Sequence, residues 1–221
     1  MSDIEIIPAI IAKDYKEFEE KVKKVEPYVK WVHFDISDGI FTKNITFRNP
    51  KEAEKLKTKV KIEVHLMVSS PERMINDWLN TGIERILVHY ESTRALRNIL
   101  EKIRKTNIEA GVVLNLKTPV NILDRLLIWK DKESRPMVNA VQFMGIAKIG
   151  FYGAEFQESV LEKIKYIREK YPEVSIAIDG GVNLKNAKEI ARAGVKRLVM
   201  GSAIFETKDI KKAIEGFKQI I

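Results

Sequence analysis

The sequence predicts an α/β fold, a single (β/α)8 TIM barrel, on three observations. Strand-like and helix-like stretches alternate along the chain, and eight such pairs fit into 221 residues without a spare segment. Strands that alternate with helices require right-handed crossovers and a parallel sheet, and eight units of this length are typical of a closed barrel. A doubly wound open sheet usually carries a glycine-rich turn after its first strand, and residues 8–13 contain no glycine. Residues 1–221 are therefore expected to form one barrel domain.

The predicted strands are short apolar runs rich in Ile, Val, Leu and Phe, and most of them end at polar or turn-forming residues. Their length is too short for a typical helix, and the charged, helix-like segments between them separate them clearly. In chain order they cover residues 5–11, 31–35, 61–67, 85–89, 109–114, 140–144, 175–179 and 197–200.

The predicted helices show apolar residues at helical spacing, as in Phe18, Val22 and Val25. Pro50 suits a first helical turn, Ser70 is an expected N-cap, and Gly82 is expected to end the helix that Ser70 begins. In chain order the helices cover 15–28, a short segment from 50, a segment from 70 to the glycine at 82, 93–105, 120–129, 159–170, 184–193 and a final helix that ends at 219.

Composition excludes several classes of function. The chain has no cysteine, which excludes disulfides, cysteine nucleophiles and thiolate metal sites. The net charge is +8, but lysines are interspersed with glutamates as on solvated helix faces, so no nucleic-acid partner is expected. No apolar run is long enough to span a membrane, and residues 1–5 lack the basic and apolar regions of a signal peptide. A cytoplasmic protein without a membrane partner is the expectation.

Polar side chains lie at the predicted strand ends, where barrel active sites are built. Alternate residues of a strand share a face, so His33 lies beside Asp35 and His65 beside Met67, while Asp179 ends the seventh strand. Two imidazoles and two carboxylates suit one divalent metal ion, and Zn²⁺, Fe²⁺, Mn²⁺ and Co²⁺ all stay open. The alternative is that each residue is a hydrogen-bonded polar group of the core.

Glycines follow the seventh and eighth predicted strands, in Gly180-Gly181 and Gly201-Ser202. In barrels these two loops often bind phosphate through backbone N–H groups. The sequence therefore predicts a phosphate site here, and the alternative is that these glycines only form tight turns.

The chain resembles the ribulose-phosphate 3-epimerase family along nearly its whole length. The motifs that carry the resemblance are HFDISDGIF at 33–41 with Asn44, which is similar to H-x-D-V-M-D-G-x-F; EVHLMV at 63–68, similar to D-V-H-L-M-V; VHYE at 88–91, similar to V-H-x-E; IDGGVN at 178–183, similar to V-D-G-G-I-N; and GSAIF at 201–205.

The resemblance implies a metal-dependent isomerase that interconverts D-ribulose 5-phosphate and D-xylulose 5-phosphate, a step of the pentose phosphate pathway. It implies one divalent metal on His33, Asp35, His65 and Asp179. The two aspartates would be the catalytic pair, transferring protons on opposite faces of the substrate through a 2,3-enediolate. Met67 and Met144 would line the site. The resemblance also suggests a homo-oligomer.

The chain departs from the family pattern at three places. Ala9 lacks a hydroxyl expected near the substrate, Ser37 replaces a methionine over the metal site, and the loop 145–155 lacks the family's N-P and Gln. Gly150 and Gly153 of that loop are still expected to offer backbone contacts to substrate.

These departures leave three alternatives to the ribulose 5-phosphate reaction open. The first is the epimerisation of another ketose phosphate, such as allulose 6-phosphate, and the second is another phosphosugar lyase or isomerase on the same barrel. Related decarboxylases and synthases carry D-x-K-x-x-D, and Asp35-Ile36-Ser37-Asp38 has no such lysine. The third is a barrel that binds without catalysing, and the retained metal quartet disfavours it.

Overall fold

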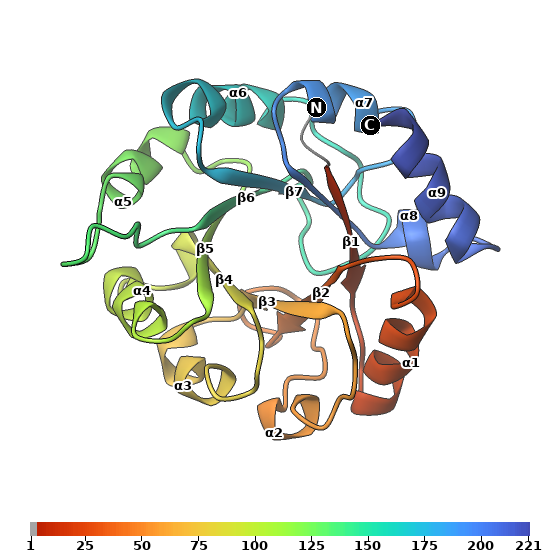
Figure 1. Cartoon of the computed structure of the whole chain (residues 1–221), viewed down its shortest axis with the longest axis horizontal. Helices are drawn as coiled ribbons and strands as arrows, with labels where there is room; N and C mark the ends of the chain where they lie inside the picture. The colour runs from red at the N-terminus through yellow and green to blue at the C-terminus, as the bar shows by residue number, and fades with distance from the viewer. Residues whose placement is uncertain (1–3) are drawn as a thin grey trace.

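The computed structural model describes residues 4–221; residues 1–3, on which part of the signal-peptide prediction rests, lie outside the described range. Eight parallel strands close into a barrel in sequence order, and helices surround it (Figure 1). The predicted (β/α)8 class is confirmed. The strands are β1 (Glu5–Ile10), β2 (Trp31–Ser37), β3 (Lys61–Met67), β4 (Arg85–His89), β5 (Glu109–Leu114), β6 (Ala140–Met144), β7 (Ser175–Asp179) and β8 (Arg197–Met200).

The last six strands have the predicted bounds, and the first two differ slightly. β1 ends one residue early, at Ile10. β2 continues two residues beyond Asp35, because Ser37 pairs with Met67 of β3 and the Ser37 N–H donates to Thr46 Oγ1 at 2.8 Å. This extension carries the β2 backbone past the polar residues at the barrel mouth.

The helices begin later or are shorter than predicted. They are α1 (Tyr15–Val25), α2 (Pro50–Ala53), α3 (Ile75–Trp78), α4 (Leu96–Arg104), α5 (Asp124–Leu127), α6 (Val160–Lys170), α7 (Ala187–Arg192), α8 (Ser202–Phe205) and α9 (Ile210–Ile220), with single 3₁₀ turns at Pro71–Arg73, Tyr90–Ser92 and Val120–Leu123. None of the helices in residues 4–221 combines the length and apolar character needed to cross a bilayer.

Local side-chain hydrogen bonds explain several of these shifts. Thr93 Oγ1 accepts from the Ala95 N–H and Asn183 Oδ1 accepts from the Lys185 N–H, so turns stand where α4 and α7 were expected to begin. Ser70 stands at the predicted N-cap position, before the 3₁₀ turn Pro71–Arg73, but it does not cap with its side chain. Ser70 has a φ of 56°, and its side chain makes no capping bond within the described chain. α3 ends at Trp78, before Gly82.

The main hydrophobic core lies between the outer face of the barrel and the helices. Phe18 of α1 stacks on Phe34 of β2 with ring centroids 4.1 Å apart, and Trp78 of α3 packs against the same Phe34. This packing holds the even-numbered residues of β2 outward. The odd-numbered residues, which include both polar site residues of β2, therefore face the barrel interior.

A charged layer fills the barrel interior below the mouth. The guanidinium groups of Arg85 and Arg197 lie 4.5 and 4.9 Å from the ring centroid of Trp31. Their Nη1 atoms lie 2.6 and 3.4 Å from Oε2 of the buried Glu63. The layer therefore fixes the Glu63 carboxylate directly beneath the polar residues of the barrel mouth.

Candidate active site

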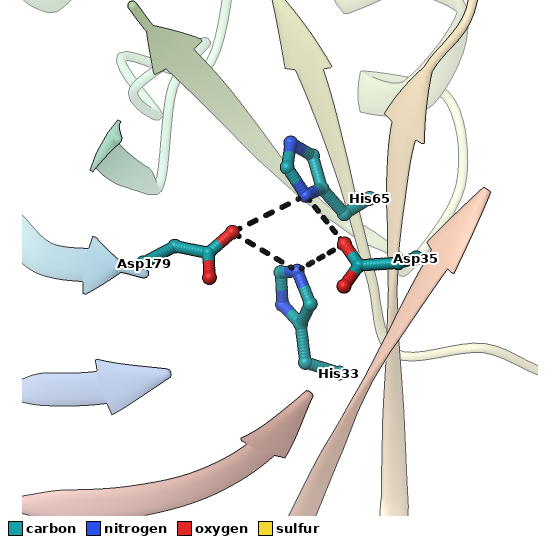
Figure 2. A group of neighbouring side chains, drawn as sticks. All are labelled: His33, Asp35, His65 and Asp179. Atoms are coloured by element: carbon teal, nitrogen blue, oxygen red, sulfur yellow. Dashed lines mark hydrogen bonds and ion pairs between the residues drawn. The ribbon is translucent and has the colours of Figure 1, made fainter. Parts of the chain in front are cut away.

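Four buried side chains converge at the mouth of the barrel. Figure 2 shows them as a ring in which imidazoles alternate with carboxylates: His33 and Asp35 from β2, His65 from β3 and Asp179 from β7. One ligand atom of each lies within 4.8 Å of the others. β2 and β3 are adjacent and β7 lies across the barrel, so the closed sheet brings together residues that are far apart in sequence.

The distances within this ring suit a shared cation. His33 Nε2 lies 3.3 Å from Asp35 Oδ1 and 3.8 Å from Asp179 Oδ2. His65 Nδ1 lies 2.9 Å from Asp35 Oδ1 and 3.5 Å from Asp179 Oδ2. Among residues 4–221, His33 Nε2 finds no hydrogen-bond partner although it is fully buried. A buried nitrogen without a partner, in a ring of two imidazoles and two carboxylates, fits a divalent metal.

Glu63 determines which nitrogen of His33 is free. His33 Nδ1 lies 2.7 Å from Glu63 Oε1, and Arg85 holds the other oxygen of that carboxylate. His33 therefore donates Nδ1–H to Glu63 and presents the lone pair of Nε2 to the ring. Such outer partners fix the tautomer of metal-binding imidazoles.

His89 and Glu91 determine which nitrogen of His65 is free. His65 Nε2 lies 2.9 Å from His89 Nε2, and His89 Nδ1 lies 3.3 Å from Glu91 Oε2. Both contacts are satisfied when His65 Nε2–H donates to His89 and His89 Nδ1–H donates to Glu91. His65 Nδ1 then keeps its lone pair for the ring. Burial lowers the pKa of His89, which favours this neutral form.

The two aspartates have pKa values that are pushed in opposite directions. Burial, reinforced by the negative charge of Asp35, raises the pKa of Asp179 to about 8. Burial alone would also raise the pKa of Asp35, but the neighbouring imidazoles of His33 and His65 outweigh it and lower that pKa well below its usual range. One carboxyl group is thus proton-free and the other protonated near neutral pH, as a paired acid and base require.

The pKa values of the two imidazoles are also shifted in opposite directions. Burial disfavours the charged form of His33, but the carboxylates of Asp35 and Glu63 outweigh it and raise the pKa of His33 well above its usual value. A metal ion at Nε2 would take the place of the proton that these carboxylates favour. Burial lowers the pKa of His65 to about 4, and the neighbouring His89 and His33 add to this effect. His65 is therefore neutral at physiological pH and able to act as a ligand.

Sequence reasoning missed Gln142 of β6. Its Nε2 donates to Asp179 Oδ2 at 3.1 Å, while its Oε1 has no hydrogen-bond partner among the described residues. Strand alternation was the available signal, because Gln142 precedes Met144 by two residues and therefore shares its inward face. The same signal marks Glu63, two residues before His65.

A pocket opens above the ring, and every residue predicted to bind substrate lines it. These residues are Met67, Met144, Gly150, Gly153, Gly180, Gly181, Gly201 and Ser202, and Asp35 and Asp179 lie on the same pocket. Ala9 also lines it, as the departure from the family pattern suggested. Ser37 does not line it: the side chain is fully buried, and its Oγ has no hydrogen-bond partner within residues 4–221.

The glycine turn after β7 interlocks with the loop after β6. Gly181 has a φ of 74°, and a Cβ added there would lie 2.7 Å from the Cα of Phe156. We expect Gly181→Ala to destabilise the fold by more than the roughly 1–2 kcal/mol cost of a left-handed alanine, and to raise KM by displacing the loop. Urea unfolding and steady-state kinetics measure both effects.

Gly82 offers a matched control for that substitution. Its φ is 73°, and a Cβ added there meets nothing within 4 Å in the described structure. Gly82→Ala is expected to show the backbone cost alone and an unchanged KM. Equal losses of stability in the two variants would contradict the interlocking of the two loops.

Glu91 is expected to stabilise the fold in a pH-dependent way. Burial would raise its pKa, but hydrogen bonds from His89, Thr118 and the Asn115 N–H outweigh it and lower the pKa from 4.5 to about 2. A depressed carboxyl pKa contributes stability that is present above pH 4.5 and is lost as the pH falls toward 2. The side chain is 21% exposed, and solvent screening reduces the contribution to on the order of 1 kcal/mol.

Thermal unfolding of Glu91→Gln tests this expectation. At pH 7 the variant should unfold at a lower temperature than the wild-type protein, and this difference in Tm should shrink as the pH falls from 5 to 2. Glu101→Gln, on the exposed face of α4, should show no such pH-dependent difference. A difference between wild type and Glu91→Gln that grows on acidification would contradict the depressed pKa.

The chain is similar over most of its length to known proteins. Residues 5–205 match the model of the ribulose-phosphate 3 epimerase family. The chain is 36% identical over 226 residues to the chloroplastic ribulose-5-phosphate-3-epimerase of Arabidopsis thaliana, covering 98% of this chain and 77% of the relative. It is 33% identical over 223 residues to the ribulose-phosphate 3-epimerase of Bacillus subtilis, covering 97% of this chain and 98% of the relative.

Solved structures show the same fold at low identity. A 3-hexulose-6-phosphate synthase superposes with a TM-score of 0.72 at 16% identity, over 99% of this chain and 100% of that one. KGPDC from Streptococcus mutans superposes with a TM-score of 0.74 at 15% identity, over 98% and 96% of the two chains. At these identities the likeness concerns the barrel architecture alone.

Proposed function

Because the chain belongs to the ribulose-phosphate 3-epimerase family, we propose that it interconverts D-ribulose 5-phosphate and D-xylulose 5-phosphate at the ring of His33, Asp35, His65 and Asp179. The family makes the chain an epimerase, an enzyme of the isomerase class that acts in carbohydrate-phosphate metabolism. The observation that supports this site most strongly is the convergence of four buried ligand groups at the barrel mouth.

The four ring residues fit one divalent metal ion, which they would hold through His33 Nε2, His65 Nδ1 and one oxygen of each aspartate. A divalent ion supplies Lewis-acid stabilisation of the negative charge that develops on substrate oxygens when a proton leaves the neighbouring carbon. The donor set does not favour one metal among zinc, iron, manganese and cobalt.

Asp35 and Asp179 are proposed as the acid–base pair. Inversion at C3 requires that a proton leaves one face of the carbon and that a proton arrives on the other. The two carboxyl groups come from β2 and β7 and face each other in Figure 2. Asp35, whose pKa is lowered, is suited to remove the proton, and Asp179, whose pKa is raised, is suited to deliver one to the opposite face of the enediolate. The reverse reaction exchanges the two roles.

The pocket above the ring is proposed to bind the phosphate. Gly180 and Gly181 have φ values of 92° and 74°, which only glycine adopts at low cost. Gly201 and Ser202 lie on the same pocket wall. The backbone N–H groups of these turns are proposed to bind the phosphate. Met67 and Met144 line the rest of the pocket without adding charge.

Specific departures from the family pattern raise a second candidate substrate. Ala9 and the loop 145–155 line the pocket with residues that differ from the family motif. Another ketose phosphate, such as allulose 6-phosphate, is therefore the second candidate, with the same acid–base pair. A homo-oligomeric state stays a prediction, and light scattering of the purified protein would test it.

Turnover of purified protein tests the proposal. The metal-free protein is reloaded separately with Zn²⁺, Fe²⁺, Mn²⁺ or Co²⁺ and given D-ribulose 5-phosphate or D-allulose 6-phosphate in D₂O, and NMR follows the C3 position. We expect D-xylulose 5-phosphate with deuterium at C3. Turnover of allulose 6-phosphate alone would support the second candidate, and metal binding without turnover of either would refute both.

A further inference from the structure

Tyr152, in the loop after β6, lines the pocket and contacts residues at the ends of β1 and β8. Its hydroxyl donates to the Ala9 carbonyl at 2.6 Å and accepts from the Ile11 N–H at 3.1 Å. Its ring lies on Gly201, where an added Cβ would be 2.2 Å from Tyr152 Cε1. One side chain from the β6 loop therefore contacts the ends of both β1 and β8.

The small residues around Tyr152 explain why the ring fits. Ala9 has only a methyl group and Gly201 has no side chain, so the space between the ends of β1 and β8 is free for an aromatic ring. A larger residue at Gly201 would clash with it. The ring thus occupies space in the pocket that the small side chains at these positions leave open.

Several contacts hold the ring in this place. Lys21 lies 5.7 Å from the ring centroid, and its Nζ donates to the Ile11 carbonyl at 2.6 Å. On the other side of the loop, Asn44 Nδ2 donates to the Gly150 carbonyl at 2.8 Å. The loop is therefore fastened to β1 and to the loop after β2, which makes Tyr152 a fixed wall of the pocket.

This wall shares its pocket with the two groups of residues proposed to bind a ketose phosphate. Asp35, Asp179, Gly201 and Ser202 all line this pocket, and the ring lies on Gly201. A substrate with its C3 between the carboxyl groups and its phosphate at the glycine turns has a fixed span to cover. A six-carbon ketose phosphate carries one additional carbon with its hydroxyl in that span, and this group would have to displace the ring.

We propose that Tyr152 determines the length of the substrate and restricts the site to five-carbon ketose phosphates. The inference rests on the proposed function, since it assumes that the reacting carbon lies between the two aspartates. One additional carbon in a tight pocket changes selectivity by about 10–200-fold. Discrimination of that size is the expected contribution of the ring.

Binding of unreactive analogues tests the inference independently of turnover. Ribitol 5-phosphate and allitol 6-phosphate lack the carbonyl group, so they bind without being epimerised. Calorimetry on the metal-loaded protein gives their dissociation constants, and kinetics gives kcat/KM for ribulose 5-phosphate and allulose 6-phosphate. We expect the wild-type protein to prefer the five-carbon compound at least tenfold in both measurements.

Three variants distinguish the contribution of the Tyr152 ring to the preference from that of its hydroxyl. Tyr152→Ala and Tyr152→Leu should each reduce the preference at least tenfold, mainly through tighter binding of the six-carbon compound. Tyr152→Phe keeps the ring and should retain most of the preference. Tyr171→Phe is the matched control, because it removes a tyrosine hydroxyl that bonds to Asp124 away from the pocket, and its preference should equal that of the wild type.

The outcomes distinguish the two proposals. An unchanged preference in folded Tyr152→Ala or Tyr152→Leu overturns the role of Tyr152, and so does tighter binding of the six-carbon analogue by the wild type. If neither ketose phosphate is epimerised but the analogues show the expected change, the proposed reaction fails while the role of Tyr152 stands. If ribulose 5-phosphate is epimerised but the Tyr152 variants keep the wild-type preference, the proposed reaction stands and the role of Tyr152 fails.

Discussion

Replacement of Asp179 by asparagine is expected to lower kcat by about 10²–10⁴-fold, the usual contribution of a positioned acid or base. Asparagine keeps the size of the side chain but neither accepts nor delivers the proton. The Gln142 amide, 3.1 Å from Asp179 Oδ2, can still hold the asparagine carbonyl, so the fold should persist. Steady-state kinetics of epimerisation, with the metal content of each preparation measured by elemental analysis, is the test.

Asp77→Asn is the matched control for this substitution, because Asp77 is exposed on α3, outside the pocket. It should leave kcat unchanged. Retention of more than a tenth of the wild-type kcat by metal-loaded Asp179→Asn would rule out Asp179 as one of the two proton-transferring groups. If the variant has also lost its metal, the loss of activity arises from the missing ligand group. Such a variant should also show no increase in Tm when metal is added.

Removal of the metal by a chelator is expected to abolish turnover and to destabilise the protein. A ligand at 100 times its dissociation constant stabilises the folded state by about 2.7 kcal/mol, which corresponds to roughly 5–10 °C in Tm for a chain of this size. The source of this stability is the buried ring, in which His33 Nε2 has no other partner within residues 4–221. Calorimetry of the chelated and the reloaded protein measures the shift.

His65→Ala is the control for the chelation experiment. His65 supplies one of the four ligand groups, so the variant should show neither the shift in Tm nor recovery of activity on addition of metal. The acidity of Asp179 adds a second readout. Its pKa is about 8 without metal, so binding at pH 7 should release protons, and calorimetry in buffers of different ionisation enthalpy detects them. Full activity in the chelated wild-type protein would contradict a metal-dependent site.

The bounds of the strands were largely predictable from sequence, because each strand is a short apolar run with sharp polar ends. The bounds of the helices were less predictable from sequence. Thr93 and Asn183 form local hydrogen-bonded turns where helices were expected to begin, and such turns compete with the first helical turn. Ser70 does precede a helical turn, but its left-handed backbone replaces the extended conformation from which a serine side chain caps.

The sequence by itself determined the fold class and the residues of the ring, because strand alternation assigns each side chain to a face and barrel topology brings the strand ends together. Only the tertiary structure decided the partners that orient them. Glu63 beneath His33, Gln142 beside Asp179 and Tyr152 over Gly201 are contacts between distant strands and loops. Their geometry depends on the closure of the barrel and on the path of the loop after β6, and neither follows from local periodicity.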